Sequence, residues 1–279
     1  MAIQTVDQVL NAIANNSSNI LIDKASISNA VAGQFYSLWR ATGQPGQGAI
    51  PTTAAICINT LTGAINFTQQ TLPATSYHSV FEALCSNNTT TLELHDRLMH
   101  MGGLNGTLLT SQTVNLDVHT NIASNNLSAR IGNSNYSDIN WWMEWYTDTG
   151  ATASNATINV TYNDGTSGDL TVVAVGGTLR ASRLILLNGL IPAASSGKFI
   201  RDINTVILSA STTTAGNFGF TATRFRSSIF QPLANSRYKE DWASLGLPEI
   251  PNESCVFPIQ LSSTTSTGTV RANGKISHG

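Results

Sequence analysis

Residues 156–175 read ATINVTYNDGTSGDLTVVAV, and their pattern sets the fold class. From Ala156 to Tyr162, apolar side chains alternate with Thr and Asn, which is the pattern of a strand with one buried face. The turn-forming run 163–168 follows, and a second run rich in β-branched residues begins at Leu170. Together these features predict an antiparallel hairpin.

Similar short runs occur on both sides of the hairpin, with no helical pattern between them. Such spacing predicts an antiparallel sandwich or jelly roll over residues 104–261. The abundance of Thr fits this expectation, because β-branched residues suit a half-exposed pleated surface. The further strands are predicted at 114–118, 140–147, 182–188, 204–210 and 217–224.

The first part of the chain, 1–103, carries the helical signals. Thr5 and Gln8 form a capping-box pattern before a helix predicted over 6–14. A second helix is predicted over 28–40, and the apolar residues at 80–84 suggest one more helical turn.

The last part of the chain, 262–279, lacks a core-forming pattern and is predicted to be a flexible tail or an arm. The chain as a whole is therefore expected to be mainly β, with a short helical N-terminal region (α+β overall).

The chain is unusually poor in charge. Only 11% of its 279 residues are charged and 41% are hydrophobic, whereas roughly 25% of an ordinary soluble domain is charged. A surface of hydroxyls and amides lacks the charge repulsion that keeps monomers apart. This composition favours a protein that packs against copies of itself.

The sequence also argues against several classes of partner and site. A net charge of −2 offers no basic field for nucleic acid. No apolar run reaches the roughly 18 residues needed to span a membrane, and the N-terminus lacks the pattern of a signal peptide. Cys57, Cys85 and Cys255 are too widely spaced for a disulfide framework or a metal site.

Two clusters of ionisable residues could carry chemistry. His95 and His100, within the acid- and base-rich segment 92–100, do not have the i, i+4 spacing of a zinc helix. Asp117 and His119 would share the polar face of a strand, but no nucleophile motif accompanies them. At 92–100 we expect local hydrogen bonding instead, with Asp96 and Arg97 satisfying the backbone of a turn and Met99 packed inside. Nothing at Asp117 and His119 favours a catalytic triad, and no catalytic, cofactor-binding or metal-ligating residue is predicted.

Two glycine-rich segments, 43–48 and 102–106, lack the Lys-Ser/Thr ending of a phosphate-binding loop. They are predicted to be turns where the backbone approaches another group closely or takes a positive φ.

The aromatic run 140–146 (NWWMEWY) has rings on both faces of its predicted strand. One interpretation is a platform on which a glycan stacks. We favour a strand packed between two apolar layers, in the sandwich core or in a seam between subunits, with Glu144 at an edge or in a salt bridge. The predicted core or interface anchors are Phe35, Trp39, Trp141 and Trp145.

Two segments carry a family resemblance. Residues 37–51 (SLWRATGQPGQGAIP) and 92–103 with its continuation to Leu116 resemble stretches of structural proteins predicted from tailed-bacteriophage genomes. The resemblance covers mainly residues 35–120 and implies a virion component associated with the head. It does not extend to the long spine helix of the common major capsid fold.

These observations lead to a non-enzymatic structural protein of a phage particle, made in the cytoplasm of the host bacterium. We expect a capsid-associated decoration or cement protein, with copies of itself (as a trimer) and the major capsid protein as partners. The alternatives are a tail, baseplate or fibre protein that binds a receptor or glycan, and the major capsid protein itself. A polysaccharide hydrolase would need paired carboxylates, and the β half offers Asp138, Glu144, Asp148, Asp164 and Asp169.

Overall fold

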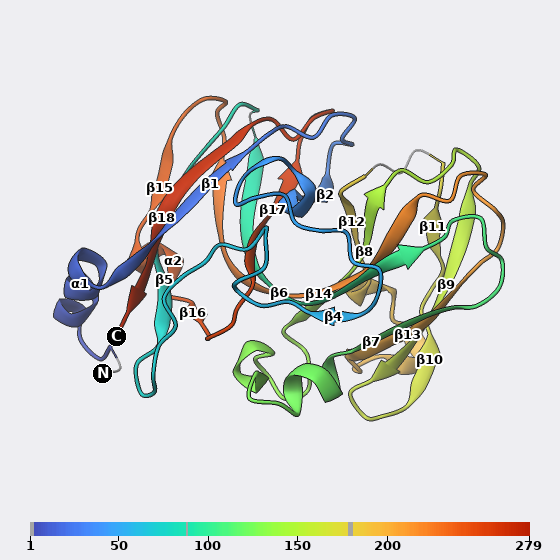
Figure 1. Cartoon of the computed structure of the whole chain (residues 1–279), viewed down its shortest axis with the longest axis horizontal. Helices are drawn as coiled ribbons and strands as arrows, with labels where there is room; N and C mark the ends of the chain where they lie inside the picture. Colours follow the sequence, from blue (N-terminus) through green and yellow to red (C-terminus); the bar gives the residue numbers. More distant parts are fainter. Residues whose placement is uncertain (1–2, 88, 178–180) are drawn as a thin grey trace. The chain divides into compact units, whose positions relative to one another are not determined.

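The computed structural model describes residues 3–87, 89–177 and 181–279. The fold is mainly β, as the sequence predicts, with three antiparallel sheets and a short N-terminal helix (Figure 1). The chain divides into two compact units at points that differ from the expected boundaries after residues 103 and 261. The first unit holds Met1–Ala49, Ile58–Asp96 and Phe225–Gly279, and the second holds Ile50–Cys57 and Arg97–Arg224.

The first unit contains two helices, and most of its strands come from the two ends of the chain. Its elements are α1 (Val6–Asn15), β1 (Ser17–Lys24), β2 (Gln34–Ser37), a 3-10 turn (Leu38–Arg40), β3 (Gly43–Gln44), β5 (Ser76–Cys85), β15 (Tyr238–Glu240), α2 (Trp242–Leu245), β16 (Glu249–Ile250), β17 (Val256–Ser262) and β18 (Val270–His278). Two long strands, β6 (Thr90–Leu104) and β14 (Asn217–Gln231), have residues in both units.

A six-stranded antiparallel sheet forms the frame of the first unit. Its strand order is β15–β5–β18–β1–β3, and β16 also pairs with β5. In the same unit β17 pairs with β2 and with the first part of β6. The helix predicted over 6–14 is confirmed as α1. Its capping box forms as expected, with the Thr5 hydroxyl accepting the Gln8 amide and the Gln8 side chain accepting the Thr5 amide.

The helix predicted over 28–40 is wrong. Gln34–Ser37 form β2, and only Leu38–Arg40 make a 3-10 turn. Gly33 has a φ of 77°, which a right-handed helix cannot contain. Pairing with β17 then satisfies the backbone groups that a helix would have satisfied internally.

The helical turn suggested at 80–84 is also wrong, because these residues lie inside β5. Phe81, Ala83 and Cys85 are buried and alternate with half-buried residues along this strand. Their spacing is the two-residue period of a strand.

The prediction of a flexible tail over 262–279 is wrong as well. Residues 270–278 form β18, which lies between β1 and β5 and pairs with both. Its inward positions include the small residues Ala272 and Gly274. A Cβ on Gly274 would lie 2.1 Å from the Val80 carbonyl oxygen, so only glycine fits there.

The second unit is an antiparallel sandwich. Its strands are β4 (Ala55–Ile56), β7 (Gln112–Asp117), β8 (Ile139–Thr147), β9 (Ser154–Tyr162), β10 (Ser167–Asp169), β11 (Val173–Val175), β12 (Arg183–Leu186) and β13 (Ile200–Leu208), with parts of β6 and β14. Its short helical turns are His119–Ala123, Ser128–Arg130, Asn188–Leu190 and Ala193–Ser195.

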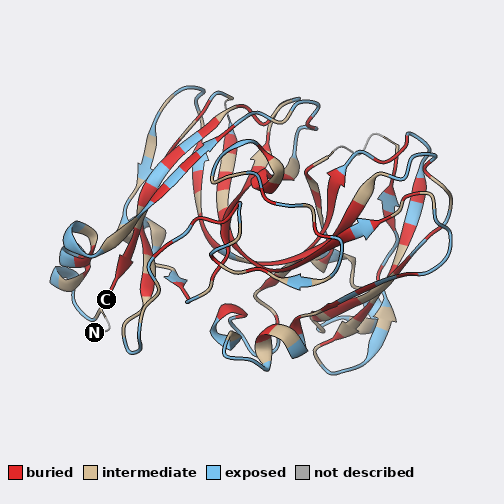
Figure 2. Ribbon diagram, viewed as in Figure 1, coloured by how far each residue is buried: buried red, intermediate tan, exposed pale blue. Residues whose placement is uncertain are grey.

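One layer of this sandwich has the order β10–β9–β13–β7, with β11 also paired to β9. The predicted hairpin is confirmed, and its second strand is divided into β10 and β11. In the other layer, β8 pairs with β12 and with the first part of β14. Side chains of both layers form one core, and Figure 2 shows the alternation of buried and exposed residues along the strands.

Candidate interaction surface

The outer face of the six-stranded sheet in the first unit carries rows of exposed and half-buried side chains. The sheet register places Leu21, Asn273 and Glu82 side by side on β1, β18 and β5. The next outward row is Asp23, Arg271 and Leu84. These positions alternate along each strand with buried residues, so their side chains lie on one face.

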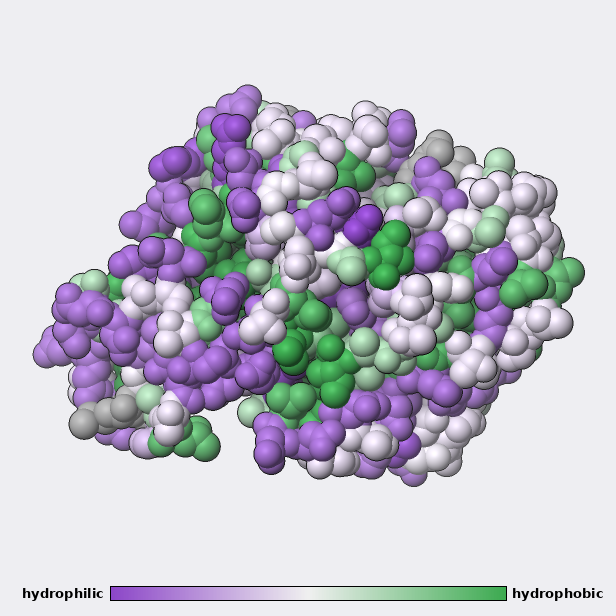
Figure 3. All heavy atoms as spheres, viewed as in Figure 1, coloured by the Kyte–Doolittle hydropathy of each residue, from purple (hydrophilic) through white to green (hydrophobic). Residues whose placement is uncertain are grey.

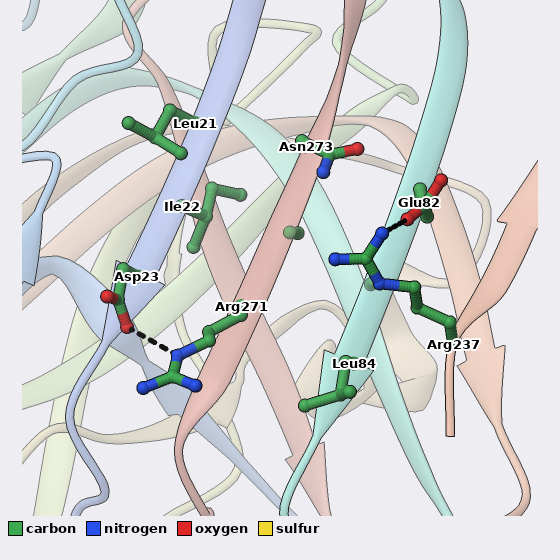
Figure 4. Close-up of a pocket in the computed structure, with 10 residues that line it drawn as sticks. Leu21, Ile22, Asp23, Glu82, Leu84, Arg237, Arg271 and Asn273 are labelled. Atoms are coloured by element: carbon green, nitrogen blue, oxygen red, sulfur yellow. Dashed lines mark hydrogen bonds and ion pairs between the residues drawn. The ribbon is translucent and has the colours of Figure 1, made fainter. Parts of the chain in front are cut away.

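A hollow of about 280 Å³ lies on this face (Figure 4). Its apolar part includes Leu21 and Leu84, and the Leu21 side chain is 62% exposed. We call this hollow and its rim the sheet hollow. Its lining residues are Leu21, Ile22, Asp23, Glu82, Ala83, Leu84, Arg237, Arg271, Ala272 and Asn273.

Two ion pairs border the sheet hollow. Arg271 Nε lies 3.4 Å from Asp23 Oδ1, and Arg237 Nη1 lies 2.6 Å from Glu82 Oε1. Both arginine side chains are more than two-thirds exposed, at 68% and 69%. Exposed pairs of this kind contribute only about 0–1 kcal/mol, so either arginine can exchange its partner at little cost.

Apolar side chains mixed with charged and amide groups are a composition found in protein–protein contacts. The edges of the same sheet are poor templates for association, because β3 has two residues, β16 has two and β15 has three. In the first unit, the face of this sheet is therefore better suited to association than its edges. On the view in Figure 3, hydrophilic and near-neutral residues dominate, with hydrophobic residues between them.

The acid- and base-rich segment 92–100 lies in β6, and its charged groups are buried. In the first unit, Asp96 accepts hydrogen bonds from Arg226 Nη2 at 3.0 Å and from the Cys255 amide at 2.9 Å. His95 Nε2 lies 2.8 Å from Glu93 Oε2, and its ring packs edge-on against Phe225. The expectation of a locally bonded turn is wrong for Asp96, because the segment is a strand and the partners of Asp96 lie 130 and 159 positions away in the chain.

In the second unit, Arg97 is the centre of a buried network. Its Nη2 lies 2.6 Å from Glu144 Oε2 and 2.9 Å from the Tyr146 hydroxyl, and Thr221 donates to the same carboxylate. Burial acts to lower the pKa of Arg97, but the Glu144 carboxylate outweighs it and the pKa is raised. Burial also raises the pKa of Tyr146. These groups form an internal ion pair that solvent does not reach.

Asp117 and His119 come close along the chain but have separate partners. Asp117 Oδ1 accepts the Thr120 amide, and His119 Nδ1 lies 2.5 Å from the Tyr136 hydroxyl. Asp202, opposite Asp117 on β13, accepts the His119 amide. Burial acts to raise the pKa of Asp117, but hydrogen bonds from Thr120 lower it overall, whereas burial raises the pKa of Asp202. These carboxylates hold the helical turn that begins at His119.

The aromatic run lies in β8 with its rings on both faces buried. Trp141, Trp142, Trp145 and Tyr146 are each at most 3% exposed. The interpretation of this strand as an exposed glycan platform is therefore wrong. The strand lies in the core of the sandwich, and Glu144 is salt-bridged to Arg97, as one of the two expected arrangements for this residue.

The structure places three of the four predicted anchors in the interior. Trp141 and Trp145 share the core of the second unit, and Trp39 is buried in the first, 6.0 Å from Phe257 between ring centroids. Phe35, on β2, is half-buried. The anchors therefore do not form one cluster.

Both glycine-rich segments show the close approach and the positive φ that were predicted, but Gly43 lies in β3 and Gly102 and Gly103 lie in β6, so these glycines are in strands rather than turns. A Cβ on Gly48 would lie 2.0 Å from Trp39 Cε2, and Gly43 has a φ of 119°. A Cβ on Gly102 would lie 2.4 Å from the Pro51 carbonyl oxygen, and Gly103 has a φ of 80°. Cys57, Cys85 and Cys255 are buried free thiols.

Sequence reasoning did not find the sheet hollow. Leu21 lies before the segment predicted as a second helix, and Arg271 lies in the segment predicted as a tail. The available signal was the alternation of Ile20, Leu21, Ile22 and Asp23, whose outward members are Leu21 and Asp23.

Comparisons with known proteins do not show a family for this chain. No family model matches the chain, and no curated protein matches it. The similar solved structures include that of the Gt strain of infectious bursal disease virus and that of a VP2 subviral particle of the same virus. They align over 94% of this chain and 81% and 80% of theirs, with 11% identity and TM-scores of 0.18 and 0.19. Alignments with such low scores carry no argument about function.

Within the described residues, no helix is long and apolar enough to cross a membrane. The same residues contain no group of three or more His, Cys, Asp or Glu side chains placed to hold a metal ion.

Proposed function

We propose that this chain is a structural subunit of a bacteriophage particle, a decoration or cement protein bound to the outside of the capsid. The observation that carries the proposal is the sheet hollow, in which Leu21 and Leu84 lie beside two ion pairs with exposed arginines on one face of a sheet. The family resemblance over residues 35–120 is the reason for assigning the chain to a bacteriophage particle.

The internal use of charge supports a structural role. Arg97 with Glu144 and Arg226 with Asp96 are buried ion pairs, so the residues that resembled a reactive cluster serve to hold strands together. The longest helix among the described residues is α1, with ten residues. An accessory protein fits this better than a shell protein built around a long spine helix.

The proposed mechanism is area burial. A standard protein interface buries roughly 1,600 Å² and needs no single strong bond. Such contacts would form between copies of this chain, arranged as trimers, and between the chain and the major capsid protein. Repeated over a shell, they would resist internal pressure. The low charge of the chain reduces repulsion between neighbouring copies.

Quantitative mass spectrometry of purified particles of the phage that encodes this chain tests the proposal. The expected result is a copy number in the hundreds, together with release of the protein when the head is dissociated. A copy number of about a dozen or fewer would place the chain in a tail, baseplate or collar instead. Absence from the particle would overturn the proposal altogether.

A further inference from the structure

A second hollow, of about 510 Å³, lies on the second unit and shares no residue with the sheet hollow. Its lining comes from the start of β8 and from the segment 188–199. A volume of this size can hold a small ligand. We call it the amide hollow, after Asn140 and Asn188 in its lining.

The side-chain amide of Asn140 makes no hydrogen bond with the described residues. Its position is nevertheless fixed. Asn188 Oδ1 accepts the Trp141 amide at 2.8 Å, and Asn188 Nδ2 donates to the Ile139 carbonyl at 2.7 Å. The backbone is therefore held on both sides of Asn140, and its amide is presented to the hollow from a fixed backbone position.

Apolar groups line another part of the amide hollow. Ile191 and Phe199 are both half-buried and belong to its lining. The backbone of Phe199 is held by Asn163, whose amide donates to the Phe199 carbonyl at 2.9 Å and whose Oδ1 accepts the Phe199 amide at 3.0 Å. Phe199 thus lines the hollow from a backbone position that is itself fixed.

The positive charge at the rim is already neutralised. Lys198 is the ionisable side chain among the described residues of the lining. Its ammonium lies 2.8 Å from Asp164 Oδ2, donates to Thr166 Oγ1 at 2.8 Å and lies 5.5 Å from the centre of the Tyr162 ring. An anionic ligand would have to compete with Asp164 for it.

We propose that the amide hollow binds a neutral saccharide. A sugar presents hydroxyls that both donate and accept, which matches the amide of Asn140 and the hydroxyls of Ser137 and Ser196. It also presents a C–H face that packs on an apolar or aromatic surface, which matches Ile191 and Phe199. Because Lys198 is paired with Asp164, the described lining offers no unpaired cation to attract a phosphate or carboxylate.

Saturation-transfer NMR and calorimetry on the full chain test this proposal, with glucose, galactose, N-acetylglucosamine and lactose as the probes and inorganic phosphate as the anionic comparison. We expect at least one sugar to bind with a Kd of about 1 mM and phosphate not to bind. Asn140→Ala and Phe199→Leu should each weaken sugar binding by about tenfold. Asn155→Ala, at an exposed position of β9 outside the lining, should leave it unchanged.

Three results would overturn the proposal. They are no transfer from any of the four sugars, binding that survives both Asn140→Ala and Phe199→Leu, and binding of phosphate in place of sugar. The far-ultraviolet circular dichroism of each variant shows whether the fold is kept. Sugar binding in solution and the copy number in the particle are separate measurements. Either the saccharide proposal or the proposed function can therefore fail without the other.

Discussion

The guanidinium of Arg97 is fully buried, and the Glu144 carboxylate 2.6 Å away compensates its charge. Removing one partner of such a pair leaves an unpaired charge in the interior, which typically costs about 3–5 kcal/mol. We expect Glu144→Ala to lower the free energy of unfolding by that amount in urea denaturation.

The exposed pair of Asp23 with Arg271 is the matched control for this prediction. Asp23→Asn should change the free energy of unfolding by less than about 1 kcal/mol, because water solvates both groups. Equal effects of the two substitutions would show that the Arg97 pair contributes no more than a surface contact.

His78 is a buried histidine that the fold keeps neutral. Its Nε2–H donates to the Val80 carbonyl at 3.1 Å, and its Nδ1 accepts from the Ser227 hydroxyl at 2.6 Å. Burial lowers its pKa from 6.5 to about 4. The unfolded chain therefore binds the proton more readily than the folded chain between these values, and stability falls as the pH falls from about 6.5 to about 4.

The size of this effect follows from the shift in pKa. A lowering from 6.5 to about 4 corresponds to about 3 kcal/mol lost across that window. Urea denaturation at several pH values measures it, and His78→Gln should have a shallower slope than the unsubstituted chain. Burial also lowers the pKa of His278, so part of the slope should remain in the variant. Identical slopes in both proteins would contradict the assignment to His78.

At the scale of elements, β18 holds the first unit together. It lies between β1 and β5 and pairs with both along most of its length. We expect a chain that ends at Gly268 to lose the cooperative unfolding of the first unit, as measured by circular dichroism and limited proteolysis. A chain that begins at Ser17 lacks α1 and the Asn16 hydrogen bonds to His278, but it should keep cooperative unfolding because α1 is a helix outside the sheet order. A folded first unit in the shortened chain would show that β18 is dispensable.

The strands that the sequence predicted well have large apolar residues at every second position. In β9, the inward positions include Ile158, Val160 and Tyr162. In β18, two of the inward positions are Ala272 and Gly274, which carry almost no hydropathy signal, and the strand was missed. The Gly there is a consequence of close backbone approach, which no local pattern reports.

β2 was mistaken for a helix for the opposite reason. Phe35, Leu38 and Trp39 fall at spacings that suit one face of a helix, yet the pairing with β17 determines the structure. The sheet hollow could not be predicted at all. Leu21, Glu82 and Arg271 come from distant parts of the chain, and only the strand order brings them together.

For the whole molecule, the central question is whether the sheet hollow is a contact surface. Leu21 is 62% exposed and lines the hollow. A charge placed there would have to be buried in any contact, which costs free energy unless it finds a partner. We therefore expect Leu21→Glu to abolish binding of the purified chain to capsids in co-sedimentation and to shift its own association towards monomer in analytical ultracentrifugation.

The stability of the chain itself should not change with this substitution, because an exposed leucine contributes little to the folded state. Leu109→Glu is the matched control, since Leu109 is 54% exposed but lies in the second unit, outside the sheet hollow. It should leave both capsid binding and self-association intact. If Leu21→Glu binds capsids as well as the unsubstituted chain, the sheet hollow is solvent-exposed in the particle, and the contact must be sought on another face.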